Sequence, residues 1–272
     1  MFIFFGELFK IINSQGGKMM KSYEEEFKNL TSTIHGLSDF ALIGKKLIIE
    51  GGDNIIKDGG NIIVGNHAGS YKDVATLFKI FPRPIFFTAN KSIFTRSDFS
   101  EMVRSHLCRQ MGNLGLLIDF FIDPIKSLFI DYISTNIARV GTIPVDLQHK
   151  KRLAVRKCQE YVKKGRAIIA LQGKGRMESE LPNPYSYPFR NGPPIISYNL
   201  YQRDGKDVPI TPLAIIGTHL PWGVPGKVNI RIGEPMFISQ FLDHDFQATV
   251  NRFRRALEKK VSRMILDLLK CR

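Results

Sequence analysis

Short apolar runs of strand length alternate with helix-length segments along most of this chain, and this alternation constrains the fold more than any other feature. Glycine and proline mark the boundaries between the segments. Chains with this pattern form α/β sheets whose faces are covered by helices. We therefore expect an α/β fold with a central mixed, largely parallel sheet flanked by helices, and a small N-terminal helical segment.

The segment boundaries follow from the apolar periodicity and the turn residues. Gly36 is expected to end the first main helix, and the prolines of segment 208–216 are expected to keep that strand irregular or at a sheet edge. Such sheets place chemistry in the loops beyond the carboxyl ends of their strands. Strands are expected at 46–50, 61–64, 84–89, 141–145, 167–171, 208–216 and 227–232, and helices at 22–37, 100–111, 124–138, 151–164, 193–201 and 247–269.

The chain length of 272 residues fits one large domain with a small appendage. We place the boundary after residue 45, with residues 1–45 as a helical segment that is a candidate for membrane association and residues 46–272 as the main domain. Met1 to Ile12 has the pattern of a short amphipathic helix. No run reaches the ~18 apolar residues that span a bilayer, and the N-terminus lacks the features of a signal peptide. We expect the chain to lie on a membrane without crossing it.

The net charge of +14 predicts a polyanionic partner, which could be nucleic acid, anionic lipid or a phosphorylated substrate. The chain has 20 Phe and one Trp, and the Phe residues lie in apolar runs typical of a core or a lipid-facing surface. Segment 114–133 is one such run, either a buried helix pair or a membrane-dipping segment. We expect no nucleic-acid partner, because no recognised binding motif is present. The three cysteines, Cys108, Cys158 and Cys271, predict neither a disulfide framework nor a zinc site.

The loop after the expected strand 61–64 concentrates polar groups: Asn66, His67, Ser70 and Asp73. Ser70 and Asp73 have the spacing of a capping box at the start of a helix. Asp73 therefore has two interpretations. It could serve the positive end of the helix dipole, or it could accept a hydrogen bond from His67 and fix the tautomer of the imidazole. A carboxylate in the first helical turn could do both.

This loop resembles the first motif, Asn-His-x-Ser-x-x-Asp, of the glycerol-phosphate and lysophosphatidic acid acyltransferase family, the PlsC-like acyltransferases. The family has four residues between the His and the Asp, and this chain has five between His67 and Asp73. The additional residue falls before Ser70. We expect Gly69 to accommodate it as a one-residue bulge, because glycine adopts positive φ at little cost.

Further segments resemble the family's other motifs in the same order. Residues 141–146 resemble the second motif, but Leu147 stands where the family has Arg. The nearby Lys150 and Arg152 could replace that Arg in binding phosphate, or could simply be a solvated helix start. Residues 208–215 and 226–235 resemble the fourth motif and the closing strand, so the similarity covers about residues 45 to 270.

The segment Gln172 to Arg176 stands where the family has Pro-Glu-Gly-Thr-Arg. The Pro and the Glu are absent, and the segment is closer to the glycine-rich version of the chloroplast-type enzymes. Glycine-rich backbone lets N–H groups approach an anion, and Arg176 can bind phosphate oxygens in a bidentate manner. By itself, this segment would be an ordinary basic turn.

The resemblance implies transfer of a fatty acyl group from acyl-CoA or acyl-carrier protein to the hydroxyl of a glycerol-phosphate or lysophospholipid acceptor. It implies His67 as general base, oriented by Asp73, with no cofactor and no metal. The expected location is cytoplasmic, on the inner face of a membrane with an anionic surface. The irregular first and third motifs leave an alternative open, a catalytically weakened relative that binds anionic lipid. The expected substrate-binding residues are Asn66, Ser70, Lys150, Arg152, Gly173, Lys174, Gly175 and Arg176.

Overall fold

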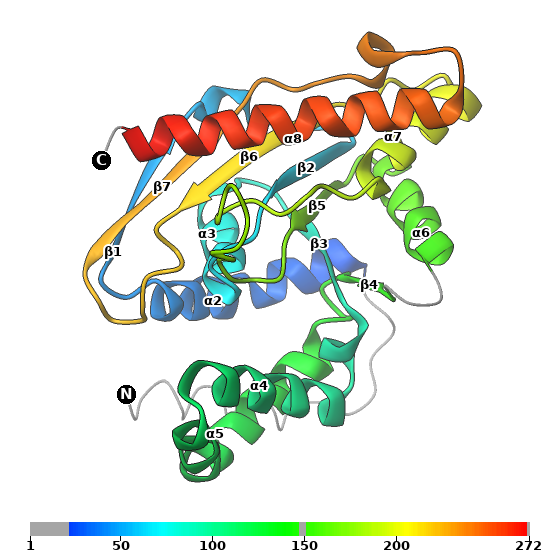
Figure 1. Cartoon of the computed structure of the whole chain (residues 1–272). Coiled ribbons are helices and arrows are strands. Elements are labelled where there is room, and N and C mark those ends of the chain that lie inside the picture. The colour runs from blue at the N-terminus through cyan, green and yellow to red at the C-terminus, as the bar shows by residue number, and fades with distance from the viewer. Residues whose placement is uncertain (1–21, 147–150, 271–272) are drawn as a thin grey trace. The chain divides into compact units, whose positions relative to one another are not determined.

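The computed structural model describes residues 22–146 and 151–270 (Figure 1). The chain divides into two compact units, Met1–Asn29 with Ala89–Val145 and Leu30–Thr88 with Asp146–Arg272. The domain boundary expected after residue 45 stays a prediction; Leu30 and the residues that follow it belong to the second unit. The amphipathic helix expected at Met1 to Ile12 lies outside the described residues.

Seven strands form one sheet in the order β1-β7-β6-β2-β5-β3-β4. Strand β2 pairs in parallel with β5 and β6, β3 with β5, and β1 with β7, whereas β6 and β7 are antiparallel. The expected mixed, largely parallel sheet is thus confirmed. The strands are β1 (Lys45–Glu50), β2 (Asn61–Asn66), β3 (Ile85–Asn90), β4 (Ile143–Val145), β5 (Ala167–Gln172), β6 (Ile210–Ile216) and β7 (Gly226–Ile232).

Helices occupy most of the remaining described chain, close to the expected ranges. The longer ones are α2 (Tyr23–Ala41), α3 (Tyr71–Ile80), α4 (Arg96–Met111), α5 (Asn113–Asn136), α6 (Lys151–Lys163), α7 (Gly192–Asp204) and α8 (Phe246–Lys270). Short 3-10 turns lie at η1 (Gly52–Asn54), η2 (Lys91–Phe94) and η3 (Ile238–Phe241).

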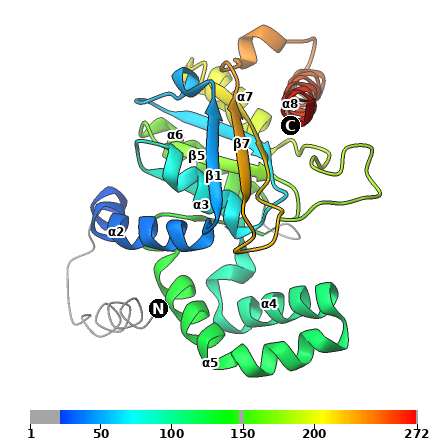
Figure 2. The same ribbon diagram turned by 90° about the vertical axis from the view of Figure 1, so that its left-hand side faces the viewer.

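The core of the second unit lies on both faces of the sheet. On one face, Ile63 of β2 and Ile169 of β5 belong to a buried cluster with Leu77 of α3. On the other face, the sulfur of Met264 in α8 and the ring of Pro212 in β6 both lie close to Gly233. The helices α3 and α8 therefore cover opposite faces (Figure 2). This packing fixes the strands whose ends carry the polar loops.

Two helices differ from the expectation. Helix α2 continues through Gly36 to Ala41, since a glycine in a helix costs only about 1 kcal/mol relative to alanine. Helix α5 runs through Pro124 instead of starting there, although an internal proline costs about 3 kcal/mol. Within α5, the buried amine of Lys126 binds Asp119 at 2.6 Å and Asp123 at 2.8 Å. These ion pairs link the turns on the two sides of the proline.

Of the two alternatives expected for the strand at 208–216, the edge position is wrong, because β6 lies between β7 and β2. Its ladder to β7 begins at Leu213, which pairs with Ile232. Pro212 precedes that ladder, and its carbonyl accepts a hydrogen bond from the Gly233 N–H at 2.9 Å. The missing N–H of the proline therefore falls where no partner strand needs it.

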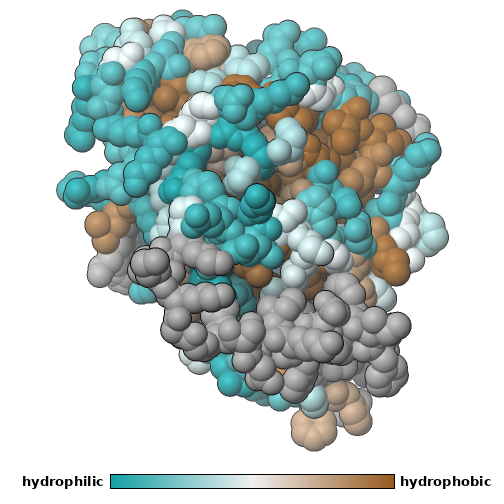
Figure 3. Space-filling view, turned by 180° about the vertical axis from the view of Figure 1, so that it is seen from behind, coloured by the Kyte–Doolittle hydropathy of each residue, from teal (hydrophilic) through white to brown (hydrophobic). Residues whose placement is uncertain are grey.

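The surface of the described chain carries both hydrophobic and hydrophilic side chains. Figure 3 shows hydrophobic side chains gathering in one area of the face in view, among mainly hydrophilic ones. Within segment 114–133, Phe120 and Phe121 are exposed whereas Ile130 is buried, so this segment is not a fully buried helix pair. No helix among the described residues is long and apolar enough to cross a membrane. Cys108 and Cys158 are free thiols, and Cys271 lies outside the described residues.

Candidate active site

Three loops of the second unit start at the same edge of the sheet. Asn66 and Gln172, the last residues of β2 and β5, are register partners, and Gly65 of β2 is the partner of Leu213 in β6. Because these strands are parallel, the loops that begin at His67, Gly173 and Gly217 leave the sheet side by side.

His67 and Asp73 form a hydrogen bond of 2.8 Å between Nδ1 and Oδ2. The Asp73 carboxylate is fully buried, whereas the His67 side chain is partly exposed. Asp73 also accepts hydrogen bonds from the Gly69 N–H at 2.8 Å and from the Thr218 hydroxyl at 2.5 Å. An ionised carboxylate only accepts, so Nδ1 carries the proton and Nε2 presents a lone pair.

The additional residue between His67 and Asp73 is accommodated at Ser70, and the expectation that Gly69 takes positive φ is wrong. Ser70 has φ 55° and ψ −129°, a conformation that L residues rarely adopt. Gly69 is needed for a different reason: a Cβ there would lie 2.2 Å from the Cβ and hydroxyl of Thr218. Ser70 is the N-cap of α3 as expected, but its side chain makes no capping hydrogen bond, so the predicted capping box is absent.

The glycine-rich loop after β5 packs directly against His67. The Gly175 N–H donates to the His67 carbonyl at 3.1 Å. A Cβ on Gly173 would lie 2.8 Å from that carbonyl oxygen, and a Cβ on Gly175 would lie 3.3 Å from His67 Nε2. Both glycines have positive φ. The glycines thus leave room beside the imidazole nitrogen that carries the lone pair.

The two cations of this loop share one carboxylate. Glu178 Oε2 lies 3.2 Å from Arg176 Nη2 and 3.7 Å from Lys174 Nζ, and it accepts a hydrogen bond from the Tyr187 hydroxyl. The hydrogen bonds from Tyr187 and then Arg176 hold the pKa of Glu178 below its usual range. Lys174 also lies over the Tyr187 ring, 5.3 Å from its centroid. The loop is therefore basic but partly neutralised from within.

The Asn66 side chain is fully buried, and its amide forms hydrogen bonds within the sheet. It donates to the Ile215 carbonyl at 2.9 Å and accepts from the Ile215 N–H at 2.8 Å. This pair ties β2 to β6 immediately before His67. Arg152 is exposed in the first turn of α6, and Lys150 lies outside the described residues. Substrate binding by Asn66, Ser70, Lys150 and Arg152 stays a prediction.

Sequence reasoning missed several residues that support this site. Thr218 holds Asp73, Glu178 and Tyr187 hold the cations, and the buried amine of Lys72 donates to the Leu220 carbonyl. Burial lowers the pKa of Lys72 below its usual value. One signal was available: Thr218 follows the apolar strand β6 after a single residue, Gly217, much as His67 follows β2.

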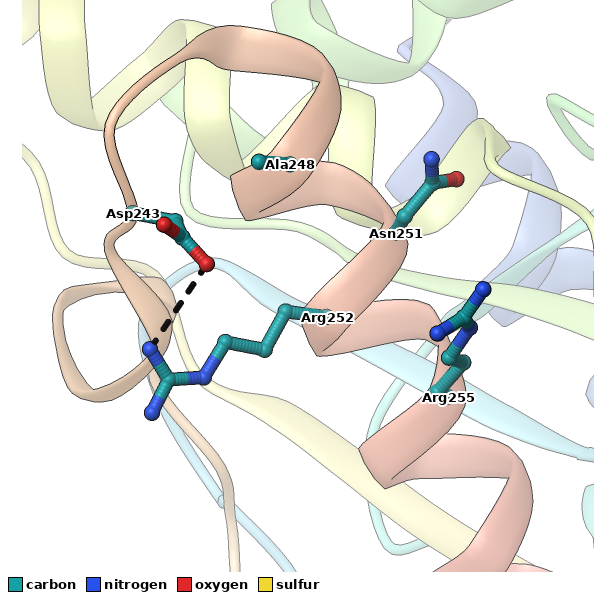
Figure 4. Close-up of a pocket in the computed structure, with 5 residues that line it drawn as sticks. All are labelled: Asp243, Ala248, Asn251, Arg252 and Arg255. Atoms are coloured by element: carbon teal, nitrogen blue, oxygen red, sulfur yellow. Dashed lines mark ion pairs between the residues drawn. The ribbon is translucent and has the colours of Figure 1, made fainter.

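A hollow with a volume of about 400 Å³ lies at the N-terminal part of α8 (Figure 4). In it, Arg252 Nη1 lies 3.8 Å from Asp243 Oδ2. The residues that line it are separate from the His67 loops: Asp243, Ala248, Asn251, Arg252 and Arg255. Among the residues that the structure describes, no group of three or more His, Cys, Asp or Glu side chains could hold a metal ion.

Comparison with known proteins shows which solved structures share this fold. No protein-family model and no curated protein sequence matches the chain. Among solved structures, the 1-acyl-sn-glycerophosphate (LPA) acyltransferase PlsC from Thermotoga maritima is similar over 98% of this chain and 88% of that chain, with a TM-score of 0.55 and 19% identity. The chain therefore has the fold of that acyltransferase.

Proposed function

We propose that this protein is an O-acyltransferase of the glycerol-phosphate and lysophosphatidic acid acyltransferase family. It would move a fatty acyl group from acyl-CoA or acyl-carrier protein to the hydroxyl of a glycerol-phosphate or lysophospholipid. The observation that carries the proposal is the His67–Asp73 pair, whose Nε2 side faces a glycine-rich basic loop. The fold shared with PlsC, named as an LPA acyltransferase, supports it.

The proposed reaction uses His67 Nε2 as the base. It removes the proton of the acceptor hydroxyl while the hydroxyl oxygen attacks the thioester carbonyl carbon. The tetrahedral intermediate then expels the donor thiolate, which takes the proton from the imidazolium. Asp73 stabilises the imidazolium and fixes the tautomer throughout. Both steps balance without a metal or a redox partner.

The basic loop would hold the acceptor phosphate. Lys174 and Arg176 supply two cations on either side of Gly175, whose Cβ position lies 3.3 Å from His67 Nε2, and the glycine backbone permits close approach of an anion. Glu178 already occupies these cations, so an acceptor must compete with it for them. The cytoplasmic, membrane-surface location is part of this proposal, since such acceptors are lipids or lipid precursors.

The test is acyl transfer by purified protein against an acceptor panel, with both donor types. We expect His67→Ala to lower kcat by roughly 10²–10⁴-fold, the usual contribution of a positioned general base. His244→Ala is the matched control, because His244 is an exposed histidine that also contacts carboxylates, those of Asp243 and Asp245. Unchanged transfer in His67→Ala would remove the general-base role, whereas no transfer by the wild-type protein to any acceptor would favour the lipid-binding alternative.

A further inference from the structure

Four exposed apolar side chains lie on two chain segments that contact each other, and we call them the Trp222 patch: Phe40, Ile43, Trp222 and Val224. Each is between 45% and 54% exposed. Phe40 and Trp222 are in contact, with ring centroids 5.2 Å apart. Ile43 and Val224 lie in the two chain segments that flank this contact. Exposed apolar side chains that gather in one place usually mark an interaction surface.

The Trp222 patch is held rigidly from below. The Gly226 N–H donates to the Gly44 carbonyl at 3.0 Å, and the Lys45 amine donates to the carbonyls of Pro221 and Val224. A Cβ on Gly44 would lie 3.1 Å from the Gly223 carbonyl oxygen, so the two segments are in close contact. These hydrogen bonds and the close contact fix the backbone of both segments, so the four side chains stay exposed to solvent.

Trp222 is suited to an apolar environment with a wet border. Its indole N–H donates to the Phe40 carbonyl at 2.8 Å. The only polar group of the side chain is thus already satisfied within the protein, and moving the ring out of water leaves no unpaired donor. In membrane proteins, Trp is typically found at the boundary between lipid headgroups and acyl chains.

The charged side chains beside the patch indicate which charge its binding partner should carry. Lys46 of β1 and Lys227 of β7 are register partners and both are exposed. Among the described residues, neither makes an ion pair. The nearby acidic side chain of Asp39 is paired with Lys79 at 2.8 Å. The unneutralised charge at the border is therefore positive.

We infer that the Trp222 patch docks the protein on an anionic lipid bilayer, with Phe40, Ile43, Trp222 and Val224 in the interface and Lys46 and Lys227 over the headgroups. Scattered cations around aromatic side chains suit a fluid anionic surface, where no directional pairing is needed. The loop that carries Trp222 also carries Thr218, which supports Asp73, so docking would place the His67 site at the lipid surface. The inference does not require the proposed acyl transfer.

The sole tryptophan of the 272-residue chain makes this surface directly measurable. The full chain is mixed with vesicles of phosphatidylcholine alone or with phosphatidylglycerol, and Trp emission is recorded. On the anionic vesicles we expect emission at shorter wavelength and quenching by brominated acyl chains. Unchanged emission during vesicle binding would overturn the inference and point to another surface, such as the exposed Phe120 and Phe121.

Variants separate the apolar and ionic contributions. Ile43→Ser with Val224→Ser keeps the Trp probe and should weaken vesicle binding about tenfold or more. Lys46→Gln with Lys227→Gln should weaken it on the order of tenfold, with the difference shrinking at high salt. Leu242→Ser with Leu266→Ser removes two exposed apolar side chains elsewhere and should change nothing.

The remaining outcomes count against the inference. Equal weakening in the Leu242 and Leu266 control, or no binding to any vesicle, overturns it. An emission shift that follows protein concentration without lipid assigns the patch to self-association instead. Acyl transfer to a water-soluble acceptor, measured without vesicles, should be unchanged in all three double variants, so that this result and a failure of the proposed function are distinguishable.

Discussion

At the scale of single residues, Asp73 depends on three donors contributed by two segments far apart in sequence. His67 and Gly69 precede it in the same loop, and Thr218 comes from the loop after β6. A buried carboxylate that loses one donor keeps the cost of its desolvation. The orientation of the imidazole is therefore set partly by a residue that never touches it.

Thr218→Val tests this dependence, because it removes the hydroxyl and nearly preserves the shape. We expect a loss of about 1–3 kcal/mol of unfolding free energy, from the unpaired carboxylate oxygen. We also expect a lower kcat with little change in KM, since in the proposed reaction Thr218 positions His67 through Asp73 and does not bind substrate. Thr218→Ser restores the donor and should recover most of both quantities. Failure of the Ser variant to recover kcat would show that the methyl group, not the hydrogen bond, matters.

Cys158 offers a second test at this scale. Burial in α6 raises the pKa of its thiol to about 12, so the thiolate is scarce at pH 8. We expect no alkylation of Cys158 in the folded protein and full alkylation in urea, read by mass spectrometry of its peptide. Cys108, which is only half-buried, should react before Cys158 in the folded state. Rapid labelling of Cys158 without denaturant would mean that α6 opens readily.

At the scale of elements, the strand and helix ranges were predictable because apolar periodicity reports burial directly. The order of strands was not, since it depends on contacts between distant segments. Gly36 and Pro124 were misleading because their local cost is outweighed by the packing or ion pairs around them. Pro212 was misleading because its missing N–H falls where no partner strand needs it. The His67–Asp73 contact was predictable from spacing, whereas Thr218, Glu178 and Tyr187 come from other loops.

The contact between the loops after β2 and β6 makes Gly69 intolerant of a side chain. In Gly69→Ala the new Cβ would overlap Thr218, so one loop must move. We expect a destabilisation of about 1–3 kcal/mol, together with slower acyl transfer. Gly192→Ala is the matched control, because nothing lies within 4 Å of its Cβ position and its φ is not positive. Equal melting temperatures for the two variants would contradict this account.

At the scale of the whole molecule, the chain divides into one unit built on the sheet and another that contains α4 and α5. The helical unit holds a buried charge cluster, in which Lys126 contacts Asp119 and Asp123. The hydrogen bonds and charges of these two carboxylates raise the pKa of Lys126 above its usual value, against the lowering effect of burial. The stability of this cluster is therefore a property of one unit and not of the sheet.

Lys126→Ala should accordingly destabilise the unit that contains α4 and α5 more than the unit built on the sheet. Asp119 would be left nearly buried without its closest cation, and removing one partner of a buried pair costs about 3–5 kcal/mol. We expect faster hydrogen exchange for amides of α4 and α5, with β2, β5 and β6 unchanged. Lys163→Ala, which breaks a more exposed pair with Asp204, is the control. Uniform loss of protection across both units would show that they unfold together.

The paired amide of Asn66 has a consequence for the ageing of the protein. Asparagine is one of the thermolabile residues, and its hydrolysis yields aspartate. Here the product would face the Ile215 carbonyl with an acceptor where a donor stood, and the contact between β2 and β6 would open next to His67. Because the fold itself immobilises this amide in a strand, the damage should begin only in molecules that have already unfolded, and it should then block their return.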